Sequence, residues 1–375
     1  MKNIKKISNL QKKFFCKFYK LNLICKKFIK MKKIYIFYFF VFTFFSCETK
    51  VDLNEDWQSI PIIYSILNQE DSISYVRINK AFIGDESIYA MAKESDSLIY
   101  DPLKVSVKLE EWNNNNLKKT INLDYTYDIK KDTITEYGDF SIFGNEKHII
   151  YFTKEKLNSD NEYRLNIDVD GKKITARTVL INDFVLLKNF ESLIKKVSFS
   201  GDEFKIEWLS NENARIYDLI IRFKYFEITK THDTIYKTFE WHDNNWLSRS
   251  DALKNDLKMA LRISSKNFFN EIIKQIPEKP ENIKSRVIKN NDALDFIFIS
   301  GGDDLNTYIE VNKPSYGLMQ DKKDFTNINN GYGLFSCRFT RIIKRKRLNP
   351  ETISLIINKD ETKHLGFKSE TTIEN

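Results

Sequence analysis

Alternating apolar and polar positions dominate the chain from about residue 57 onward, and they predict a mainly β fold. Ile60–Leu67 is a nearly continuous apolar run, which suits a strand that is buried on both faces. Tyr163–Val169 and Ile174–Val179 both alternate, and Asp170-Gly171 between them favours the type I′ turn of a hairpin. Strands at this spacing, with no long helix between them, predict an antiparallel immunoglobulin-like β-sandwich over residues 57–182.

Other short runs in this part of the chain fit the same sandwich. The further predicted strands are Tyr75–Ile78, Val105–Leu109, Thr120–Asp128 and His148–Phe152, with a turn of four asparagines at Asn113–Asn116. Ile83–Tyr100 has no strand pattern and reads as a long crossover loop. Such a loop is a candidate contact surface, although loops are also where sandwiches vary most.

Residues 183–368 show a mixed pattern and predict a second, β-rich α+β domain, followed by a polar tail at 369–375. Its predicted strands include Phe204–Leu209, Ile216–Ile228, Thr234–Trp241, Ala293–Ser300, Thr307–Val311, Leu334–Arg341 and Ile353–Ile357. Ser250–Ile276 is the one predicted helical segment, because its apolar residues recur every three or four positions and Pro277 ends it. The pair Ser264-Ser265 could divide that segment into two helices.

Three short features of the second domain receive structural interpretations. Trp208, in the middle of a strand, is expected in the core. Gly301-Gly302-Asp303-Asp304 lacks the alternating oxygen ligands of a calcium loop and is interpreted as a tight turn. Lys344-Arg345-Lys346-Arg347 is expected at a solvated strand end or loop.

The stretch Met31–Asp52 has the pattern of an export signal. Lys32 and Lys33 precede an apolar run of twelve residues, which is too short to span a membrane as a helix. Ser46-Cys47 supplies a small residue before a thiol, as a bacterial lipoprotein site requires. We therefore predict a signal peptide at 31–46, cleavage between Ser46 and Cys47, a lipid on Cys47 and a polar tether at 47–56. A plain membrane anchor and a chance cysteine are the alternatives.

Residues 1–30 hold ten lysines and no acidic residue. Met31 begins a signal of normal length, so the preferred interpretation is that translation starts there; a basic amphipathic segment on anionic lipid is the alternative. Residues 1–46 contain 12 lysines, so 48 of the 60 basic residues follow Ser46, against all 52 acidic ones. The remaining chain is slightly acidic, which argues against a nucleic-acid partner.

Compact catalytic signatures are absent from the sequence. It has four histidines, none near a serine or cysteine in a nucleophile context, and no GxSxG, HExxH or glycine-rich phosphate loop. No CxxC pair or Cys/His cluster points to zinc, and Cys337 has no expected disulfide partner if Cys47 is lipidated. The sequence therefore predicts no cofactor, no metal site and no catalytic residue.

Two polar segments are candidate ligand surfaces. Phe239–Trp246 mixes aromatic and polar side chains, and Trp241, His242, Asn244 and Trp246 could floor a carbohydrate or peptide site. A strand end followed by a capped turn is the preferred explanation. Asn327 and Asn329 lie in an Asn- and Gly-rich stretch that a tight hydrogen-bonded loop would also explain.

Three stretches carry a family resemblance. Pro61–Asn68 (PIIYSILN), Tyr75–Phe82 (YVRINKAF) and Phe325–Phe335 (FTNINNGYGLF) resemble a family of uncharacterised Bacteroidetes surface lipoproteins that carry domain-of-unknown-function labels. The resemblance spans most of residues 47–368 and implies a lipid-anchored, β-rich protein. Some similar lipoproteins accompany TonB-dependent outer-membrane transporters, which implies such a transporter as a partner. The resemblance implies no catalytic residue in this sequence.

Together these features predict an outer-membrane lipoprotein, periplasmic or surface-exposed, that acts as a non-enzymatic binding or assembly module. Its contact would be a transporter, a surface glycan or a peptide. The alternative is a carboxylate-dependent hydrolase of envelope or extracellular polymers, assembled from acidic residues distant in sequence.

Overall fold

The computed structural model describes residues 58–83, 98–129, 148–242, 247–248, 257–289, 291–313 and 324–370. The predicted signal, cleavage site, lipid attachment at Cys47 and tether all lie outside these ranges, as does most of the predicted contact loop 83–100. The description that follows concerns the compact unit Asp56–Asn375. Within its described residues, no helix combines the length and apolar character needed to cross a membrane.

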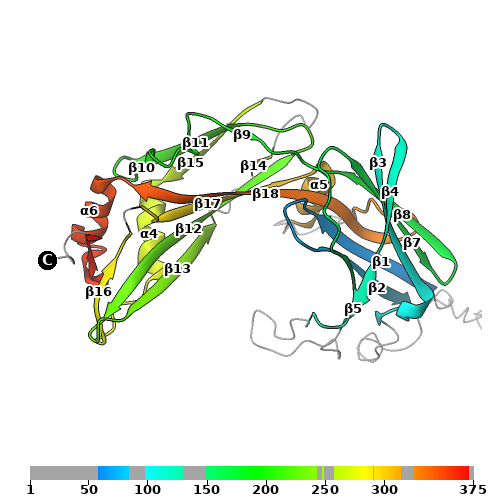
Figure 1. The fold of residues 1–375 in the computed structure, drawn as a ribbon, viewed down its shortest axis with the longest axis horizontal. Helices are drawn as coiled ribbons and strands as arrows, with labels where there is room; N and C mark the ends of the chain where they lie inside the picture. The colour runs from blue at the N-terminus through cyan, green and yellow to red at the C-terminus, as the bar shows by residue number, and fades with distance from the viewer. Residues whose placement is uncertain are drawn as a thin grey trace, which may run out of the picture. The chain divides into compact units, whose positions relative to one another are not determined.

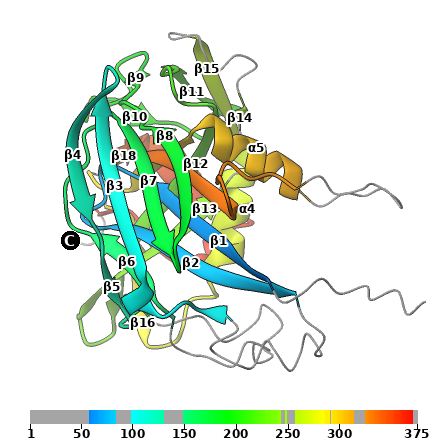
Figure 2. The same ribbon diagram turned by 90° about the vertical axis from the view of Figure 1, so that its right-hand side faces the viewer.

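The described chain is mainly β, as the sequence predicts (Figures 1 and 2). Its strands, in chain order, are β1 (Gln58–Leu67), β2 (Ser74–Ile83), β3 (Val105–Asn113), β4 (Asn116–Asn122), β5 (Asp124–Thr126), β6 (Ile150–Thr153), β7 (Glu162–Val169), β8 (Lys172–Val179), β9 (Val185–Leu186), β10 (Lys196–Val197), β11 (Glu203–Leu209), β12 (Ile216–Thr229), β13 (Thr234–His242), β14 (Leu247–Ser248), β15 (Lys258–Ser264), β16 (Ile283–Val287), β17 (Leu294–Gly301), β18 (Tyr332–Leu348) and β19 (Phe367–Lys368). The helices are α4 (Ser265–Gln275), α5 (Asp303–Asn312) and α6 (Pro350–Asn358), with short 3₁₀ turns η1 (Pro102–Lys104) and η2 (Lys363–Leu365).

Strand pairing divides the described strands among three sheets. The largest has the order β19-β16-β12-β17-β18-β1-β2-β6-β5, with β10 also paired to β18 and β13 and β14 paired to β12. A four-stranded antiparallel sheet has the order β4-β3-β7-β8, and a three-stranded sheet has the order β15-β11-β9.

Strand β18 links the first and last parts of the chain. Its residues 332–337 pair in parallel with 62–67 of β1, and its later residues pair antiparallel with β17. Gly333 makes the first pairing possible, because its φ is +114° and a Cβ there would lie 1.9 Å from the carbonyl oxygen of Ile63. β18, which belongs to the predicted second domain, therefore joins the sheet that contains β1 and β2 of the predicted first domain.

Two predicted turns form as expected, one directly after β7 and the other directly after β3. Asp170 and Gly171 have φ of +51° and +78°, and Asn114 and Asn115 have φ of +48° and +61°. Positive φ at both central residues is the requirement of a type I′ turn, which Asp-Gly and Asn-Asn satisfy at low cost. The resulting hairpins β7–β8 and β3–β4 build the four-stranded sheet.

The predicted single helical segment is wrong, since the described residues hold three helices. Within residues 257–276, the described part of that segment, only α4 is helical; Lys258–Ser264 forms β15 and pairs antiparallel with β11. Leu257 and Leu261 fit a helical spacing, whereas Met259, Leu261 and Ile263 alternate as in a strand, and pairing with β11 decides between the two. The serine pair marks the junction, with Ser264 as the N-cap of α4.

Two further predictions at the C-terminal end are corrected. Asp303 and Asp304 do not form a tight loop turn; they begin helix α5. The same helix covers residues 307–311, which were predicted as a strand. Acidic side chains are favourable at that position because they face the positive end of the helix dipole. The predicted strand 353–357 is α6, whose N-cap Asn349 accepts a hydrogen bond from the Thr352 N–H.

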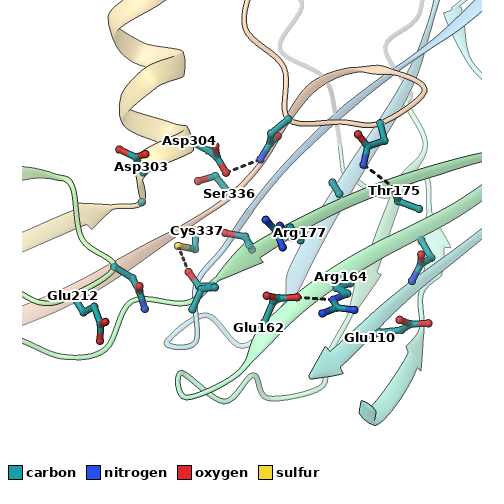
Figure 3. A pocket seen from close by; sticks show the side chains of 18 residues that line it. Glu110, Glu162, Arg164, Thr175, Arg177, Glu212, Asp303, Asp304, Ser336 and Cys337 are labelled. Atoms are coloured by element: carbon teal, nitrogen blue, oxygen red, sulfur yellow. Dashed lines mark hydrogen bonds and ion pairs between the residues drawn. The ribbon is translucent and has the colours of Figure 1, made fainter. Parts of the chain in front are cut away.

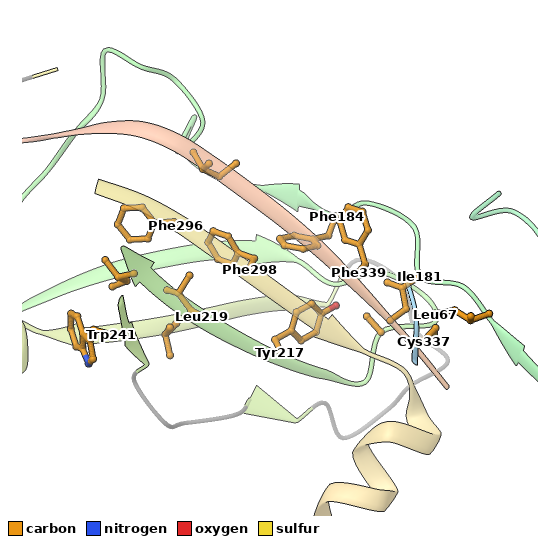
Figure 4. Close-up of a cluster of buried hydrophobic side chains, with 14 of the residues drawn as sticks. Leu67, Ile181, Phe184, Tyr217, Leu219, Trp241, Phe296, Phe298, Cys337 and Phe339 are labelled. Atoms are coloured by element: carbon orange, nitrogen blue, oxygen red, sulfur yellow. The ribbon is translucent and has the colours of Figure 1, made fainter. Parts of the chain in front are cut away.

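The core is rich in aromatic side chains (Figure 4). Phe184 makes edge-to-face contacts with Tyr217, Phe298 and Phe339 at centroid distances of 5.9, 5.7 and 6.2 Å. Trp208 is 1% exposed, which confirms its predicted core position.

The basic run at 344–347 is only partly a solvated strand end. Lys346 is fully buried, and its Nζ donates to the carbonyl oxygens of Phe190 and Ser192 at 2.7 and 2.6 Å. Burial lowers the pKa of Lys346 to about 8, with repulsion from Lys195 adding to the shift. A buried ammonium needs such acceptors, because an unpaired charge in the core would be strongly destabilising.

Candidate functional site

A large groove lies beside the outer edge of β8 (Figure 3) and has a volume of about 1140 Å³. Its floor comes from β7 and β8, and its walls come from the start of α5, the loop 324–331, the start of β18 and the turn before β12. The lining residues are Glu110, Glu162, Arg164, Asn166, Thr175, Ala176, Arg177, Thr178, Val179, Glu212, Asn213, Gly302, Asp303, Asp304, Asn327, Asn329, Ser336 and Cys337.

The β7–β8 hairpin places the floor residues on one face. Its register pairs Arg164 with Arg177 and Asn166 with Thr175. Ile174, Ala176 and Thr178 are buried on the opposite, core-facing side. Because side chains alternate along a strand, the tight turn at Asp170-Gly171 fixes which polar residues share the groove face.

Arg164 is held in place on this floor. Its Nε donates to Glu162 Oε1 at 2.5 Å, and its guanidinium lies 4.0 Å from the centre of the Trp112 ring. Trp112 in turn donates from Nε1 to Glu110 Oε2 at 2.9 Å. The cation–π contact and the ion pair restrict the arginine to one orientation, so less conformational entropy is lost when it binds another group.

The asparagine loop forms one wall and is fastened to both neighbouring strands. Asn327 Nδ2 donates to the Phe335 carbonyl at 2.7 Å, and the Phe335 N–H donates back to Asn327 Oδ1 at 2.9 Å. Asn329 and Thr175 exchange two backbone hydrogen bonds of 2.8 and 3.3 Å, and their side chains are joined at 3.2 Å. The stretch is thus a hydrogen-bonded loop whose side chains also line the groove.

The facing wall carries two neighbouring carboxylates from the start of α5. Asp303 is exposed and lies 3.6 Å from Arg215 Nε, whereas Asp304 is half-buried and accepts a hydrogen bond of 2.8 Å from Asn327 Nδ2. Burial raises the pKa of Asp304 above its usual value; the Asn327 hydrogen bond opposes this, the Asp303 charge adds to it and Arg177 opposes it. The two acids therefore differ in environment despite being neighbours.

Ser336 and Cys337 close the bottom of the groove. Ser336 is 1% exposed and lines the groove. Cys337 donates from Sγ to the Val179 carbonyl at 3.0 Å, and burial raises the pKa of its thiol to about 12. This thiol is therefore a packing group rather than a nucleophile at neutral pH.

The candidate residues of the sequence analysis separate in space. Asn327 and Asn329 line the groove. Trp241 is 6% exposed and its ring is 6.3 Å from that of Phe268 in the core, so it presents no open face to a ligand. His242 is exposed, with Nδ1 3.8 Å from Asp218 Oδ2. Asn244 and Trp246, like Ser46 and Cys47, lie outside the described residues.

Several groove residues had no distinguishing signal in the sequence. Glu162, Arg164 and Arg177 occupy the polar positions of an ordinary alternating hairpin, and Glu110 belongs to another strand. The available hint was that the alternate positions 162, 164, 166 and 168 of β7, and 173, 175 and 177 of β8, are all polar. Among the described residues, no group of three or more His, Cys, Asp or Glu side chains is arranged to hold a metal ion.

No family model matches this chain, and no curated protein matches it. Among solved structures, it is similar to the C-terminal globular domain of oligosaccharyltransferase from Pyrococcus abyssi, at 9% identity and a TM-score of 0.24. That match covers 64% of this chain and 46% of the archaeal one, so this chain spans less than half of that structure's length.

Proposed function

We propose that this protein is a lipid-anchored lipoprotein of the outer membrane that acts as a binding or assembly module, with the groove beside β8 as its contact site. The anchor would be a diacylglyceryl group on Cys47. Residues 57–182 would form an immunoglobulin-like sandwich, and residues 183–368 a β-rich α+β domain that contains β18. A TonB-dependent outer-membrane transporter is the proposed envelope partner.

The observation that carries the proposal is the character of the groove. It is lined by hydrogen-bonding side chains that other residues hold in fixed orientations, as Glu162 and Trp112 hold Arg164 and as Asn327 contacts Asp304. A small number of fixed polar groups in a concave site is typical of recognition sites. The same groove offers no metal cluster among its described residues and no activated nucleophile.

The anchor and the contact site can be tested together. The intact protein, solubilised gently from membranes, is used as bait in an affinity pull-down analysed by mass spectrometry. We expect a retained envelope partner or ligand that is reduced by Arg177→Ala in the groove and unchanged by Lys237→Ala on exposed β13. Repeated failure to retain anything would contradict the binding role. Loss of globomycin-sensitive processing and of membrane retention in Cys47→Ser would test the anchor separately.

A second candidate, a carboxylate-dependent hydrolase, rests on one observation. Asp304 has a raised pKa beside the exposed Asp303, which is a pairing of environments that acid–base catalysis uses. Hydrolysis of an envelope polysaccharide that disappears in Asp304→Asn would favour this candidate. Unchanged hydrolysis in that variant, or none in the wild type, would leave the groove as a binding site only.

A further inference from the structure

The outer edge of β8 is already occupied on both sides of Arg177. Thr175 uses its backbone N–H and carbonyl on Asn329, and the Lys173 carbonyl accepts a hydrogen bond of 2.9 Å from Asn330 Nδ2. On the other side, the Val179 carbonyl accepts from the Cys337 thiol at 3.0 Å. A peptide that binds by adding a strand needs a run of free backbone groups, so this edge does not offer one.

Apolar pockets for peptide side chains are also lacking along the groove. Among its described lining residues, the apolar side chains are those of Ala176, Val179 and Cys337, and no aromatic residue is included. Peptide-recognition sites usually combine backbone pairing with apolar or aromatic pockets for alternate side chains. The groove supplies neither, which argues against an extended peptide.

The charges of the lining also argue against an acidic polymer. Five carboxylates and two arginines line the groove, so its field repels a polyanion. The residue types are those that bind hydroxyl groups in pairs: a carboxylate accepts two O–H groups, and a guanidinium donates to two oxygens. Both types meet on the floor, where Glu110 on β3 lies directly across from Arg164 and Arg164 directly across from Arg177.

A hydroxyl group also lies at the bottom of the groove. Ser336 lines the groove close to Gly302, where an added Cβ would be 3.5 Å from the Ser336 Oγ. The residue is 1% exposed, so little bulk water reaches it. A hydroxyl both donates and accepts, so Oγ is chemically suited to pair with a hydroxyl of a ligand in the groove.

From these contacts we infer that the groove binds a neutral oligosaccharide, with Arg177, Asp304 and Ser336 contacting its hydroxyl groups. The inference rests on the proposed function and names its ligand class. A sugar hydroxyl both donates and accepts, so it can bridge the arginines of the floor and the carboxylates of the wall. The volume of about 1140 Å³ is at the upper end of ordinary small-molecule sites, which suits several sugar units rather than one.

The test measures binding of the intact protein in detergent micelles to immobilised hexaoses, followed by calorimetry in solution. The neutral probes are cello-, manno-, xylo- and maltohexaose; hexagalacturonate, a sulfated chondroitin hexasaccharide and a lysine-rich decapeptide are the charged probes. We expect a neutral hexaose to bind. Its affinity should fall about tenfold or more in Arg177→Ala and about two- to tenfold in Ser336→Ala, as expected for losing one charged and one neutral hydrogen bond. Lys237→Ala, outside the groove, should leave it unchanged.

Ser336→Ala is an informative variant because it removes a single hydroxyl and keeps the Cβ at the bottom of the groove, so the protein should fold. Groove-dependent binding of a charged probe would overturn the neutral-sugar inference and leave the binding function standing. Sugar binding that neither groove variant changes would overturn the assigned site. If no hexaose binds, the inference is overturned; the pull-down then decides separately whether a binding function remains.

Discussion

Asn327 and Asp304 come from different segments and meet at the groove through a hydrogen bond of 2.8 Å from Asn327 Nδ2 to Asp304 Oδ2. The same amide group also donates to the Phe335 carbonyl, and its oxygen accepts from the Phe335 N–H. One side chain thus fastens the asparagine loop to β18 and to the first turn of α5. The amide group has two donors and one acceptor in use, which leaves it little freedom to rearrange.

Asn327→Ala should therefore destabilise the protein by about 2–3 kcal/mol. Each lost hydrogen bond contributes about 1 kcal/mol, and the backbone groups of Phe335 lose their partner in a partly buried place. Urea unfolding followed by tryptophan fluorescence measures this. Asn182→Ala, which removes one exposed hydrogen bond to Asp160 Oδ1, is the matched control and should cost well under 1 kcal/mol. Equal losses in the two variants would contradict the fastening role of Asn327.

Gly333→Ala should be among the most damaging single changes in the chain. Its φ of +114° is unfavourable for any residue with a Cβ, and the new Cβ would overlap the Ile63 carbonyl oxygen. Relief requires β1 and β18 to separate where they pair in parallel, so we expect a loss of about 3 kcal/mol or more. Gly201→Ala is the control, because nothing lies within 4 Å of a Cβ there. Similar thermal unfolding of both variants would refute the constraint.

The sequence predicted local structure better than it predicted pairing. The turns at Asp170-Gly171 and Asn114-Asn115 carry their own conformational signal, and so both turns were predicted correctly. The returning strand after the asparagine turn is Asn116–Asn122 rather than the predicted Thr120–Asp128, because residues 124–126 pair with β6 instead of β3. Lys258–Ser264 fits a helix and a strand about equally, and its partner β11 is more than fifty residues away. Residues 303–312 and 353–357 were predicted wrongly for a similar reason: short apolar runs do not distinguish a helix from a strand.

The groove residues were harder still to predict from the sequence, because the groove depends on contacts between distant segments. Asn327 and Asn329 were candidates because Asn and Gly cluster visibly in sequence, whereas Arg164 and Arg177 look like ordinary polar positions of a hairpin. What makes them a site is the approach of α5 and β18 to the edge of β8, which depends on the parallel pairing of residues 62–67 with 332–337. No local pattern encodes a contact across some 270 residues.

Asp304→Asn should weaken ligand binding by the groove without lowering the unfolding free energy at pH 7. Because the pKa of Asp304 is raised in the folded protein, the folded state binds more protons than the unfolded state just above the ordinary pKa of 3.8. The contribution of Asp304 to stability is therefore largest below that pH and falls as the pH rises through the folded-state pKa. An asparagine keeps an acceptor for Asn327 and does not titrate.

Asp304→Asn should then match or exceed the wild type in unfolding free energy at pH 7, and the difference should shrink toward pH 4. Ligand retention by the groove should nevertheless fall. Denaturant unfolding at several pH values checks the first part, with Asp303→Asn, an exposed neighbour, as the control. A variant that is less stable than wild type at pH 7 and more stable at pH 4 would show that the sign is wrong.

Lys346 gives the opposite pH dependence from the other end of β18. Its pKa of about 8 in the folded protein lies below the ordinary lysine value of 10.5, so the unfolded state binds more protons between those two pH values. The contribution of Lys346 to stability should therefore rise as the pH increases from about 8 to 10.5 and stay constant below 8. Lys346→Met removes this titration and leaves the Phe190 and Ser192 carbonyls without their donor, at a cost of about 1–3 kcal/mol at pH 7. Unfolding of wild type and Lys346→Met between pH 7 and 10.5 should show a difference that grows with pH, and the exposed Lys344→Met should show no such growth.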